Sequence, residues 1–236
     1  MKIGIMQPYL FPYIGYFQLM NLSDIFVLHD DVQYIKGGWI NRNRLLLEGA
    51  PYLFTFAVEK ADYHLNINQR IFADSLYQDK LKLIRFLYMN YRKAPYLEPT
   101  VKLVETILDD DTRNVADFLY HSLQTIKIYL GMTTCCVLKS SDLSKDGKLH
   151  GQDRVINIVE VLGGDHYINP IGGTELYDKQ VFADRNIKLN FIQTDFSRCV
   201  YDQFDKSFVP GLSIIDVLMF NSVEKVKELL TCYDLV

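Results

Sequence analysis

The sequence predicts an α/β fold: a mostly parallel sheet with flanking helices and an inserted helical subdomain. Three observations predict it. Residues 2–29 follow the order strand, loop, helix, strand, which is typical of a parallel βαβ unit. The middle of the chain, about 66–130, repeats apolar residues near the helical period. Strand-like segments resume after it, so the helical stretch interrupts a strand-bearing part of the chain.

The N-terminal unit begins with an apolar segment, Lys2–Gln7, that predicts a short buried strand. Pro8 and Pro12 break this strand into a loop. Ile14–Leu22 carries apolar residues at helical spacing, and Asp24–His29 is a second apolar strand. This unit places its connecting loop just beyond the carboxyl end of the first strand.

A hairpin and a set of helices follow. Leu45–Leu47 and Tyr52–Val58 flank a Glu-Gly-Ala-Pro turn, which favours a hairpin. In the helical stretch, Pro95 ends one helix, Asn114 can cap a later one, and Gly131 stops that later helix. We therefore expect one domain over residues 1–236, with the helical subdomain at about 66–130.

The C-terminal part alternates strands and helices. It predicts strands at Thr133–Leu138, around Tyr167-Ile168 and over Ile187–Phe191, with a helix ending at Gly163-Gly164. Two serines cap the last helices. Ser213, followed three residues later by Asp216, resembles a capping box, and Ser222 precedes the final helix.

Composition narrows the class of protein. The 236 residues are 49% hydrophobic and 23% charged, which excludes a wholly disordered chain. A formal charge of −4 argues against nucleic acid as a partner. No segment resembles a signal peptide or a membrane span, so we expect a cytoplasmic protein. The four cysteines contain no C-x-x-C, which argues against a disulfide framework or structural zinc.

Polar residues gather in four segments that follow predicted strands: 7–16, 29–43, 167–174 and 201–213. In open α/β sheets, ligands bind beyond the carboxyl ends of the strands. We therefore expect these segments to form the site, and we predict that Gln7, Asp31 and Arg42 line one cavity.

Long motifs in these segments resemble the WbqC-like family. They are QPYLFPYIGYF from Gln7, DDVQY from Asp30, W-x-N-R-N from Trp39 and FVPGLSIID from Phe208. The similarity runs from residue 3 to about 221. Members of this bacterial family are linked to O-antigen and other surface-polysaccharide (lipopolysaccharide) biosynthesis. The resemblance implies a nucleotide-linked sugar as substrate, or an amino sugar that awaits N-acylation.

The candidate catalytic residues are Asp31, Asp30 and His29, which follow the second apolar strand. Adjacent side chains on an extended chain point to opposite sides, so we expect one carboxylate to face the site. It can act as a base on an attacking amine or hydroxyl, or ligate Mg²⁺ between phosphates. The residues leave the metal open, and solvated turn carboxylates are the alternative interpretation.

The candidate substrate-binding residues centre on Arg42, whose guanidinium suits bidentate contacts to phosphate. The flanking amides of Asn41 and Asn43 match sugar hydroxyls, and Trp39 offers a ring for stacking, against simple packing. The other candidates contribute loop backbone or side-chain hydrogen bonds: Gln7, Tyr9, Tyr13, Gly15, Tyr16, Tyr34, Gly172, Gly173, Tyr201 and Gln203.

A weaker similarity links the chain to nucleotidyltransferases of the H-x-G-H type. The aligned tetrad is Tyr13-Ile14-Gly15-Tyr16, so both histidines are replaced by tyrosines. Neutral phenols can donate hydrogen bonds to phosphate but bring no cation. The replacement argues against nucleotidyl transfer, while the Gly15 backbone and the helix N-terminus remain able to bind phosphate.

Three functions follow from these features. The first is a transferase acting on a nucleotide-linked amino sugar, with N-acylation from an activated acyl donor as its specific form. The second is a nucleotidyl- or adenylyl-transferase. The third is a non-catalytic sugar-nucleotide binding protein. The sequence leaves the oligomeric state open, and a homo-oligomer is compatible with it.

Overall fold

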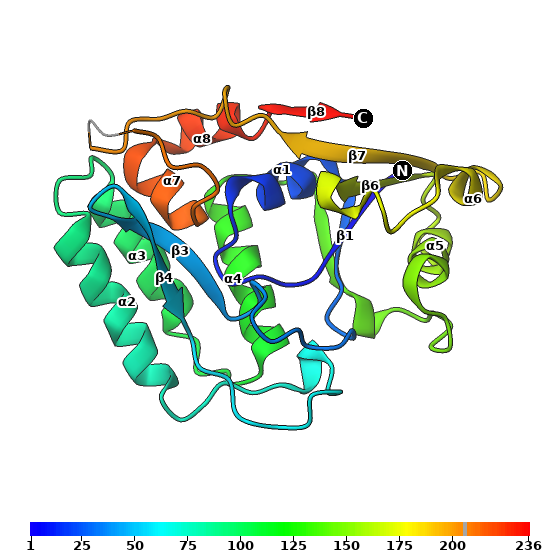
Figure 1. Cartoon of the computed structure of the whole chain (residues 1–236), viewed down its shortest axis with the longest axis horizontal. Coiled ribbons are helices and arrows are strands. Elements are labelled where there is room, and N and C mark those ends of the chain that lie inside the picture. The colour runs from blue at the N-terminus through cyan, green and yellow to red at the C-terminus, as the bar shows by residue number, and fades with distance from the viewer. Residues whose placement is uncertain (205–206) are drawn as a thin grey trace.

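The computed structural model describes residues 1–204 and 207–236 of the chain. A six-stranded sheet lies at one side of the molecule (Figure 1), in the order β5-β2-β1-β6-β7-β8. Its strands are β1 (Lys2–Met6), β2 (Ile25–Leu28), β5 (Cys136–Lys139), β6 (His166–Pro170), β7 (Lys188–Thr194) and β8 (Tyr233–Leu235). All adjacent pairs are parallel except β7 and β8. The predicted α/β class is confirmed.

Strand β1 is the point at which the strand order reverses. Ile5 pairs with Val27 of β2 on one side, and Ile3 pairs with Tyr167 of β6 on the other. The chain adds β2 and β5 in one direction and β6 and β7 in the other. The carboxyl ends of all five parallel strands therefore share one edge, and a crevice for a ligand is expected where the order reverses.

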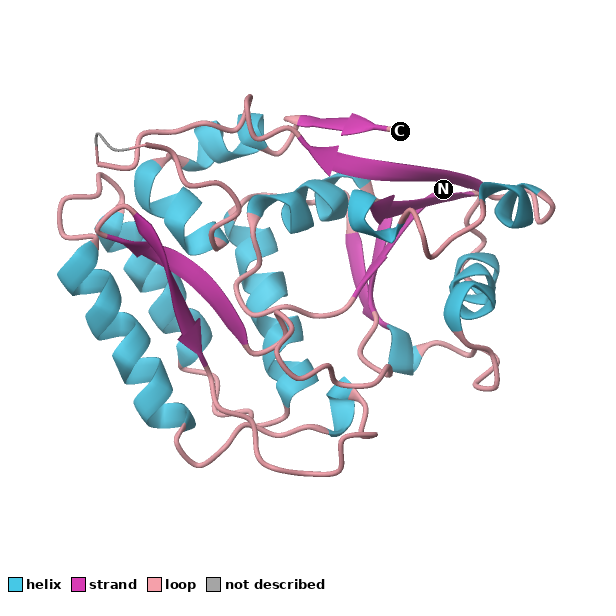
Figure 2. Ribbon diagram, viewed as in Figure 1, coloured by secondary structure: helices cyan, strands magenta, loops and turns pink. Residues whose placement is uncertain are grey.

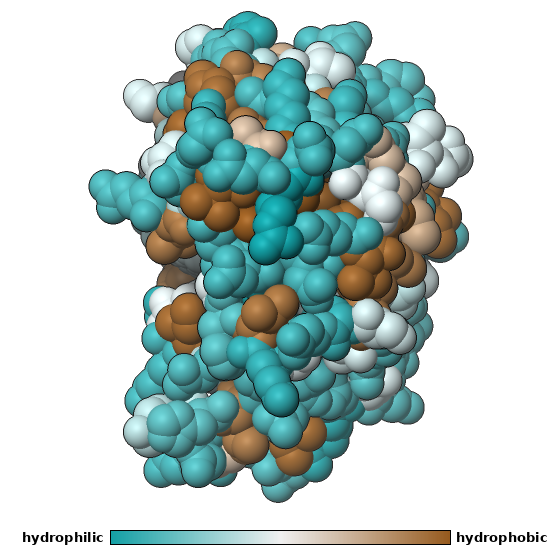
Figure 3. Space-filling model, turned by 90° about the vertical axis from the view of Figure 1, so that its right-hand side faces the viewer, coloured by the Kyte–Doolittle hydropathy of each residue, from teal (hydrophilic) through white to brown (hydrophobic). Residues whose placement is uncertain are grey.

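The sheet is covered on both faces. Helix α5 (Gly151–Val161) and helix α6 (Lys179–Ala183) pack on one face, where Ile3, Val27 and Leu189 meet Ile158 and Phe182 in a small apolar core. Helix α1 (Ile14–Leu22) covers the other face and belongs to a larger core shared with the helical half of the molecule. Figure 3 shows that the side carrying α5 and α6 is mainly hydrophilic, with separate apolar patches.

The middle of the chain forms the other half of the molecule (Figure 2). It contains the hairpin β3 (Arg42–Leu47) and β4 (Ala50–Thr55), the short η1 (Ile67–Gln69), and helices α2 (Leu76–Asn90), α3 (Leu97–Leu108) and α4 (Val115–Tyr129). The hairpin turns at Glu48 and Gly49, both with positive φ of 54° and 87°. Asn114 caps α4 as predicted, since its side chain accepts a hydrogen bond from the Asp117 amide at 3.1 Å. No helix in the described residues is long and apolar enough to cross a bilayer.

The C-terminal part contains the single turns η2 (Ser140–Asp142) and η3 (Ile171–Gly173), then α7 (Ile214–Phe220) and α8 (Val223–Leu229). Ser213 and Ser222 cap α7 and α8, as predicted. The capping-box interpretation of Asp216 is wrong. Its carboxylate turns into the core, where it accepts hydrogen bonds from the hydroxyls of Tyr91 and Tyr201, each at 2.6 Å.

Candidate functional site

An aromatic pocket of about 290 Å³ opens at the carboxyl edge of the sheet. The loop after β1 contributes Tyr9 and Tyr13, and the loop after β7 contributes Phe196. The strands β1 and β7 flank β6, so the pocket lies beside the reversal of strand order. Its lining is Tyr9, Pro12, Tyr13, Trp39, Asn43, Arg44, Phe196, Pro210 and Gly211.

Arg44 is the cation of the aromatic pocket. Its guanidinium carbon lies 5.1 Å from the centre of the Trp39 ring, and Nη2 donates to the Gly211 carbonyl at 3.3 Å. The Nε atom is buried and has no acceptor within the described residues. A buried N–H that lacks an acceptor is costly, so this atom marks a place for an anionic or carbonyl oxygen. The motif W-x-N-R-N favoured Arg42, and Arg44, which follows this motif directly, was not among the predicted site residues.

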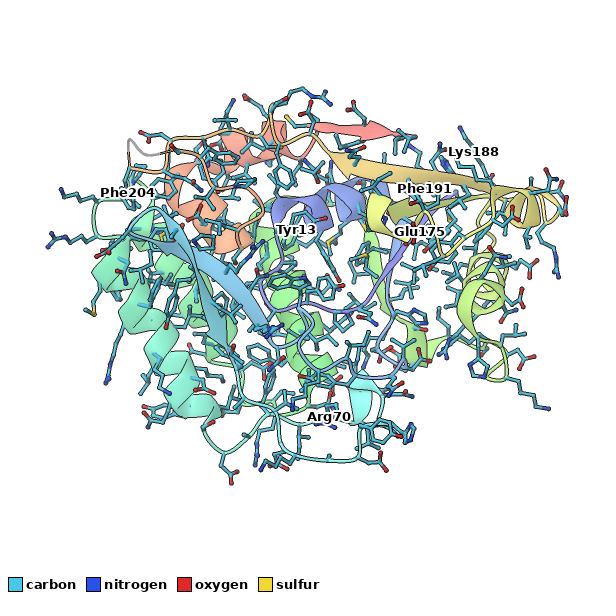
Figure 4. All side chains as sticks on the ribbon, in the orientation of Figure 1. Tyr13, Arg70, Glu175, Lys188, Phe191 and Phe204 are labelled. Carbon is cyan, nitrogen blue, oxygen red and sulfur yellow. The ribbon has the colours of Figure 1, made fainter. Side chains whose placement is uncertain are left out.

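Gly15 brings Tyr13 into the aromatic pocket. A Cβ at Gly15 would lie 2.3 Å from Cε2 of Tyr13 and 2.4 Å from Oγ1 of Thr194. Only glycine therefore lets α1 approach these two side chains. Burial raises the pKa of Tyr13, so its phenol is neutral at pH 7. Figure 4 shows Tyr13 at the centre of the molecule, at the start of α1.

Tyr16, the second tyrosine of the Y-x-G-Y tetrad, lies in the core. Its side chain is fully buried, and its hydroxyl donates to the Gln7 carbonyl at 3.0 Å. Tyr16 does not line the aromatic pocket, and this hydroxyl holds the loop after β1 instead. The pair of side chains that defines the H-x-G-H arrangement is therefore split between the pocket and the core.

A second, basic pocket of about 500 Å³ lies between the hairpin and η1. We call it the basic pocket because two arginines and two lysines line it. The lining is Tyr34, Lys36, Gly37, Asn41, Arg42, Thr55, Val58, Glu59, Lys60, Ala61, Tyr63 and Arg70. Figure 4 places Arg70 beside η1, well away from Tyr13 of the aromatic pocket.

The prediction of one cavity for Gln7, Asp31 and Arg42 is not met in these two pockets. Arg42 lines the basic pocket, and neither Gln7 nor Asp31 lines either pocket. The reason is topological. Arg42 begins β3 of the separate two-stranded sheet, whereas Gln7 and Asp31 follow strands of the six-stranded sheet.

A polar cluster lies at the carboxyl edge, in the segments that follow β2 and β5. We define it by its residues: His29, Asp30, Asp31, Ser141, Lys145 and Arg154. Asp30 is almost fully buried, and its Oδ1 and Oδ2 accept hydrogen bonds from the Ser141 amide at 2.9 Å and the Ser141 hydroxyl at 2.6 Å. Both carboxylate oxygens are thus used to join the two strand ends. This geometry favours a positioning role for Asp30.

Asp31 has different partners and binds two cations. Its Oδ2 lies 2.7 Å from both Nζ of Lys145 and Nη2 of Arg154, while its buried Oδ1 has no donor within the described residues. Burial acts to raise the pKa of Asp31, but the Lys145 hydrogen bond and the positive charge of Arg154 outweigh it, so the pKa lies below its usual range. The Lys145 side chain is only 6% exposed, so it forms this ion pair largely out of solvent.

His29 completes the polar cluster as a neutral side chain. Burial and the nearby charge of Arg154 lower its pKa to about 4. Its Nε2 is buried without a partner among the described residues. Mg²⁺ does not fit Asp30 and Asp31, because Ser141 occupies both oxygens of one and two cations face the other. Nor does any group of three or more His, Cys, Asp or Glu gather for metal binding in the described residues.

The family model of the WbqC-like protein family matches residues 7–228, which is nearly the whole chain. The chain belongs to the WbqC-like protein family. A relative in Mycobacterium tuberculosis (strain ATCC 25618 / H37Rv), named uncharacterized protein Rv1507c, is 28% identical over 223 residues, with 93% of each chain covered. No solved structure matches the chain.

Within this WbqC-like chain, the asparagines of the W-x-N-R-N segment hold loops together. Asn41 accepts from the Tyr34 hydroxyl at 2.8 Å and donates to the Phe56 carbonyl at 2.7 Å. Asn43 donates to the carbonyls of Leu10 at 3.0 Å and Phe11 at 2.9 Å. Asn43 thus ties β3 to the loop after β1 and shapes the wall of the aromatic pocket.

Two predicted substrate-binding residues near the C-terminus of the WbqC-like chain, Tyr201 and Gln203, also form hydrogen bonds that hold a loop. Tyr201 and Gln203 donate to Oδ2 of Asp216 at 2.6 Å and 2.8 Å, which fixes the loop that carries Pro210 and Gly211.

The two predicted site glycines after β6, Gly172 and Gly173, differ in the space around them. A Cβ at Gly173 would lie 1.9 Å from Nδ2 of Asn169, whereas a Cβ at Gly172 would meet open space.

Proposed function

We propose that this protein is a cytoplasmic transferase of surface-polysaccharide (O-antigen) biosynthesis. It acts on a nucleotide-linked sugar, and N-acylation of an amino sugar is its specific reaction. The observation that carries the proposal is the aromatic pocket with its single half-buried cation, Arg44, at the strand-order reversal of a parallel sheet. Pockets of this composition bind ligands that carry a ring next to an anionic group.

Three residues of the aromatic pocket have defined roles in the proposal. The ring of Trp39 stacks on the sugar or base, and Arg44 contacts a phosphate oxygen through its unpartnered Nε. Tyr13 donates a hydrogen bond as a neutral phenol, since burial keeps its pKa high. These contacts orient the substrate along the carboxyl edge, toward the loops that hold the polar cluster.

The polar cluster supplies the acid–base group. An attacking amine must lose a proton, and neutral His29 has a ring nitrogen without a partner among the described residues. Asp31 holds Lys145 and Arg154 in place, which keeps two cations beside the imidazole. These cations can stabilise negative charge that develops on a carbonyl oxygen under attack.

The splitting of the Y-x-G-Y tetrad disfavours nucleotidyl transfer. Tyr16 donates to a backbone carbonyl in the core, so it offers no donor to a phosphate. A binding protein without activity remains the alternative that the experiment must separate from a transferase.

The test uses the only tryptophan of the chain, Trp39, as a probe inside the aromatic pocket. Titration of UDP-linked amino sugars should change its fluorescence. Arg44→Gln should weaken binding by about 10–100-fold, because it removes a charge-assisted hydrogen bond worth about 1.5–3 kcal/mol. Arg85→Gln, at an exposed position that lines neither pocket, is the matched control and should leave the sugar affinity within about twofold.

Turnover is measured separately, as a single-turnover rate of acyl transfer to the bound sugar from coenzyme A thioesters or from an adenylate formed with ATP. Saturable binding with no transfer from either donor would support the binding protein over the transferase. Equal sugar affinities of Arg44→Gln and Arg85→Gln would show that the aromatic pocket is not the sugar site.

A further inference from the structure

We propose that the basic pocket is a second ligand site, which binds the polyphosphate group of a nucleotide-sized molecule. The proposed function places the sugar substrate in the aromatic pocket and assigns nothing to the basic pocket. The inference rests on the charges, the arginine geometry and the size of the basic pocket, and it stands whether or not the protein is a transferase.

The charge of the basic pocket is strongly positive. Lys36, Arg42, Lys60 and Arg70 line it, and Glu59 is the one carboxylate among its lining residues. Glu59 is already paired, because its Oε1 lies 2.6 Å from Nη2 of Arg113, which does not line the pocket. Four cations thus surround a space in a chain whose formal charge is −4. Such a local excess attracts a ligand that carries several negative charges.

Arg70 is fixed at the base of this space. Its side chain is almost fully buried, and its guanidinium lies 4.9 Å from the centre of the Tyr34 ring. Nη1 donates to the Asp62 carbonyl at 3.0 Å, and Nη2 donates to the Glu59 carbonyl at 2.7 Å. Its buried Nε has no acceptor within the described residues. Arg70 is therefore preorganised, and it retains N–H groups that can donate hydrogen bonds to a ligand oxygen.

Arg42 also lines the basic pocket, and its guanidinium is likewise held by two backbone carbonyls. Its Nε donates to the Gly38 carbonyl at 3.0 Å, and its Nη2 donates to the Gly37 carbonyl. Gly37 has a φ of 83°, a conformation that favours glycine, so the turn carrying Lys36 is shaped to meet the guanidinium. Each guanidinium has five N–H donors, and two hydrogen bonds leave three for a ligand.

These features fit a polyphosphate better than other anions. Planar arginine forks bind phosphate oxygens in bidentate fashion, and two forks with two lysines match a group of two or more charges. The volume of about 500 Å³ accommodates a nucleoside diphosphate and exceeds that of the aromatic pocket. Tyr34 and Tyr63 offer ring faces for a base. The cations surround a pocket rather than form a stripe, which argues against a nucleic-acid chain.

The test is calorimetric titration of ADP, UDP and inorganic pyrophosphate into the full chain. The variant Lys36→Gln/Lys60→Gln removes two exposed lysines of the basic pocket and should lower the affinity for ADP at least tenfold. The matched control is Lys102→Gln/Lys188→Gln, which removes the same charge from exposed positions outside the basic pocket. The control should keep the affinity within about twofold. Figure 4 shows Lys188 on the side of the molecule opposite Arg70.

Two outcomes overturn the inference and leave the proposed function standing. One is the absence of binding by all three probes at millimolar concentration. The other is loss of ADP binding in Arg44→Gln with none in the lysine variant, which would move the ligand to the aromatic pocket. Tighter binding of ADP than of pyrophosphate would assign a nucleotide, and equal binding would assign a free polyphosphate. Either result supports a polyphosphate site in the basic pocket when the lysine variant lowers the affinity at least tenfold, and an unchanged affinity in that variant overturns the inference.

Discussion

Two adjacent carboxylates at the end of β2 have different partners, although their side chains are chemically identical. Asp30 accepts a hydrogen bond from Ser141, and Asp31 forms ion pairs with Lys145 and Arg154. The alternation of side chains along an extended chain predicts that the two face differently, and the different partners agree with this alternation; that one of them faces a substrate stays a prediction. The partners themselves could not be predicted, because they lie more than a hundred residues away in sequence.

At this scale, removal of the Asp31 charge should destabilise the fold. Asp31→Asn leaves the Lys145 and Arg154 side chains, which are 6% and 13% exposed, without their anion. Breaking a largely buried pair from one side costs about 3 kcal/mol in the free energy of unfolding. Urea denaturation measures it. Asp109→Asn, at an exposed position, should change stability by less than about 0.5 kcal/mol. Equal stability of the two variants would contradict the ion-pair assignment.

The site itself was predicted only in part, and Arg42 and Arg44 show why. The two arginines are two residues apart at the start of β3, so the sequence gives no reason to prefer one. Arg44 enters the aromatic pocket because Phe196 and Gly211 close that pocket from the loop after β7. No sequence pattern near Arg44 indicates that residues so distant in the chain will form a pocket around it. The alternating R-N-R pattern could at least have indicated both arginines.

At the scale of elements, segments with a clear apolar pattern were predicted well, and the short α6 and β8 were missed. Helix α1 has the predicted bounds. Strand β1 ends one residue earlier than predicted, and β2 is one residue shorter than predicted at each end. Helix α6 has only five residues, and β8 has three. Strand β8 is defined by its antiparallel pairing with β7, which supplies hydrogen-bonding partners that the local sequence does not reveal.

The contact between α1 and its neighbours depends on Gly15. Gly15→Ala places a methyl group within 2.4 Å of Tyr13 and Thr194, so these side chains or α1 must shift, which disturbs the position of Tyr13 in the aromatic pocket. We expect a loss of about 1–3 kcal/mol in stability and weaker sugar binding by Trp39 fluorescence. Gly172→Ala is the control, because its methyl group meets open space. Unchanged binding in Gly15→Ala would show that the position of Tyr13 does not matter.

At the scale of the whole molecule, His29 links stability to pH. The unfolded imidazole titrates near 6.5, and the folded one has a pKa of about 4. Between these values the unfolded chain binds one more proton at this site, so the free energy of unfolding falls as the pH falls. From pH 7 to 4 the loss from His29 approaches about 3 kcal/mol. Below pH 4, Asp31, whose pKa is lowered, adds a further loss as it is protonated.

Urea denaturation across this pH range isolates the His29 contribution as a difference between variants. His29→Gln removes the titrating group and should flatten the stability curve between pH 6.5 and 4. His64→Gln, at an exposed position, should leave the slope unchanged. A His29→Gln curve parallel to that of the unaltered protein would show that this histidine is not held neutral by the fold.

The aromatic pocket also determines when, during synthesis, the chain can first bind a ligand there. A nascent chain leaves the ribosome from its N-terminus, so β1, α1 and β2 can associate early through short loops. The pocket around Tyr13 also needs Phe196 and Gly211, which are synthesised almost two hundred residues later. Until those residues emerge, Tyr13 and Trp39 form an incomplete wall. A ligand of the aromatic pocket should therefore recognise only finished chains, and its binding would mark the completion of folding rather than guide its first steps.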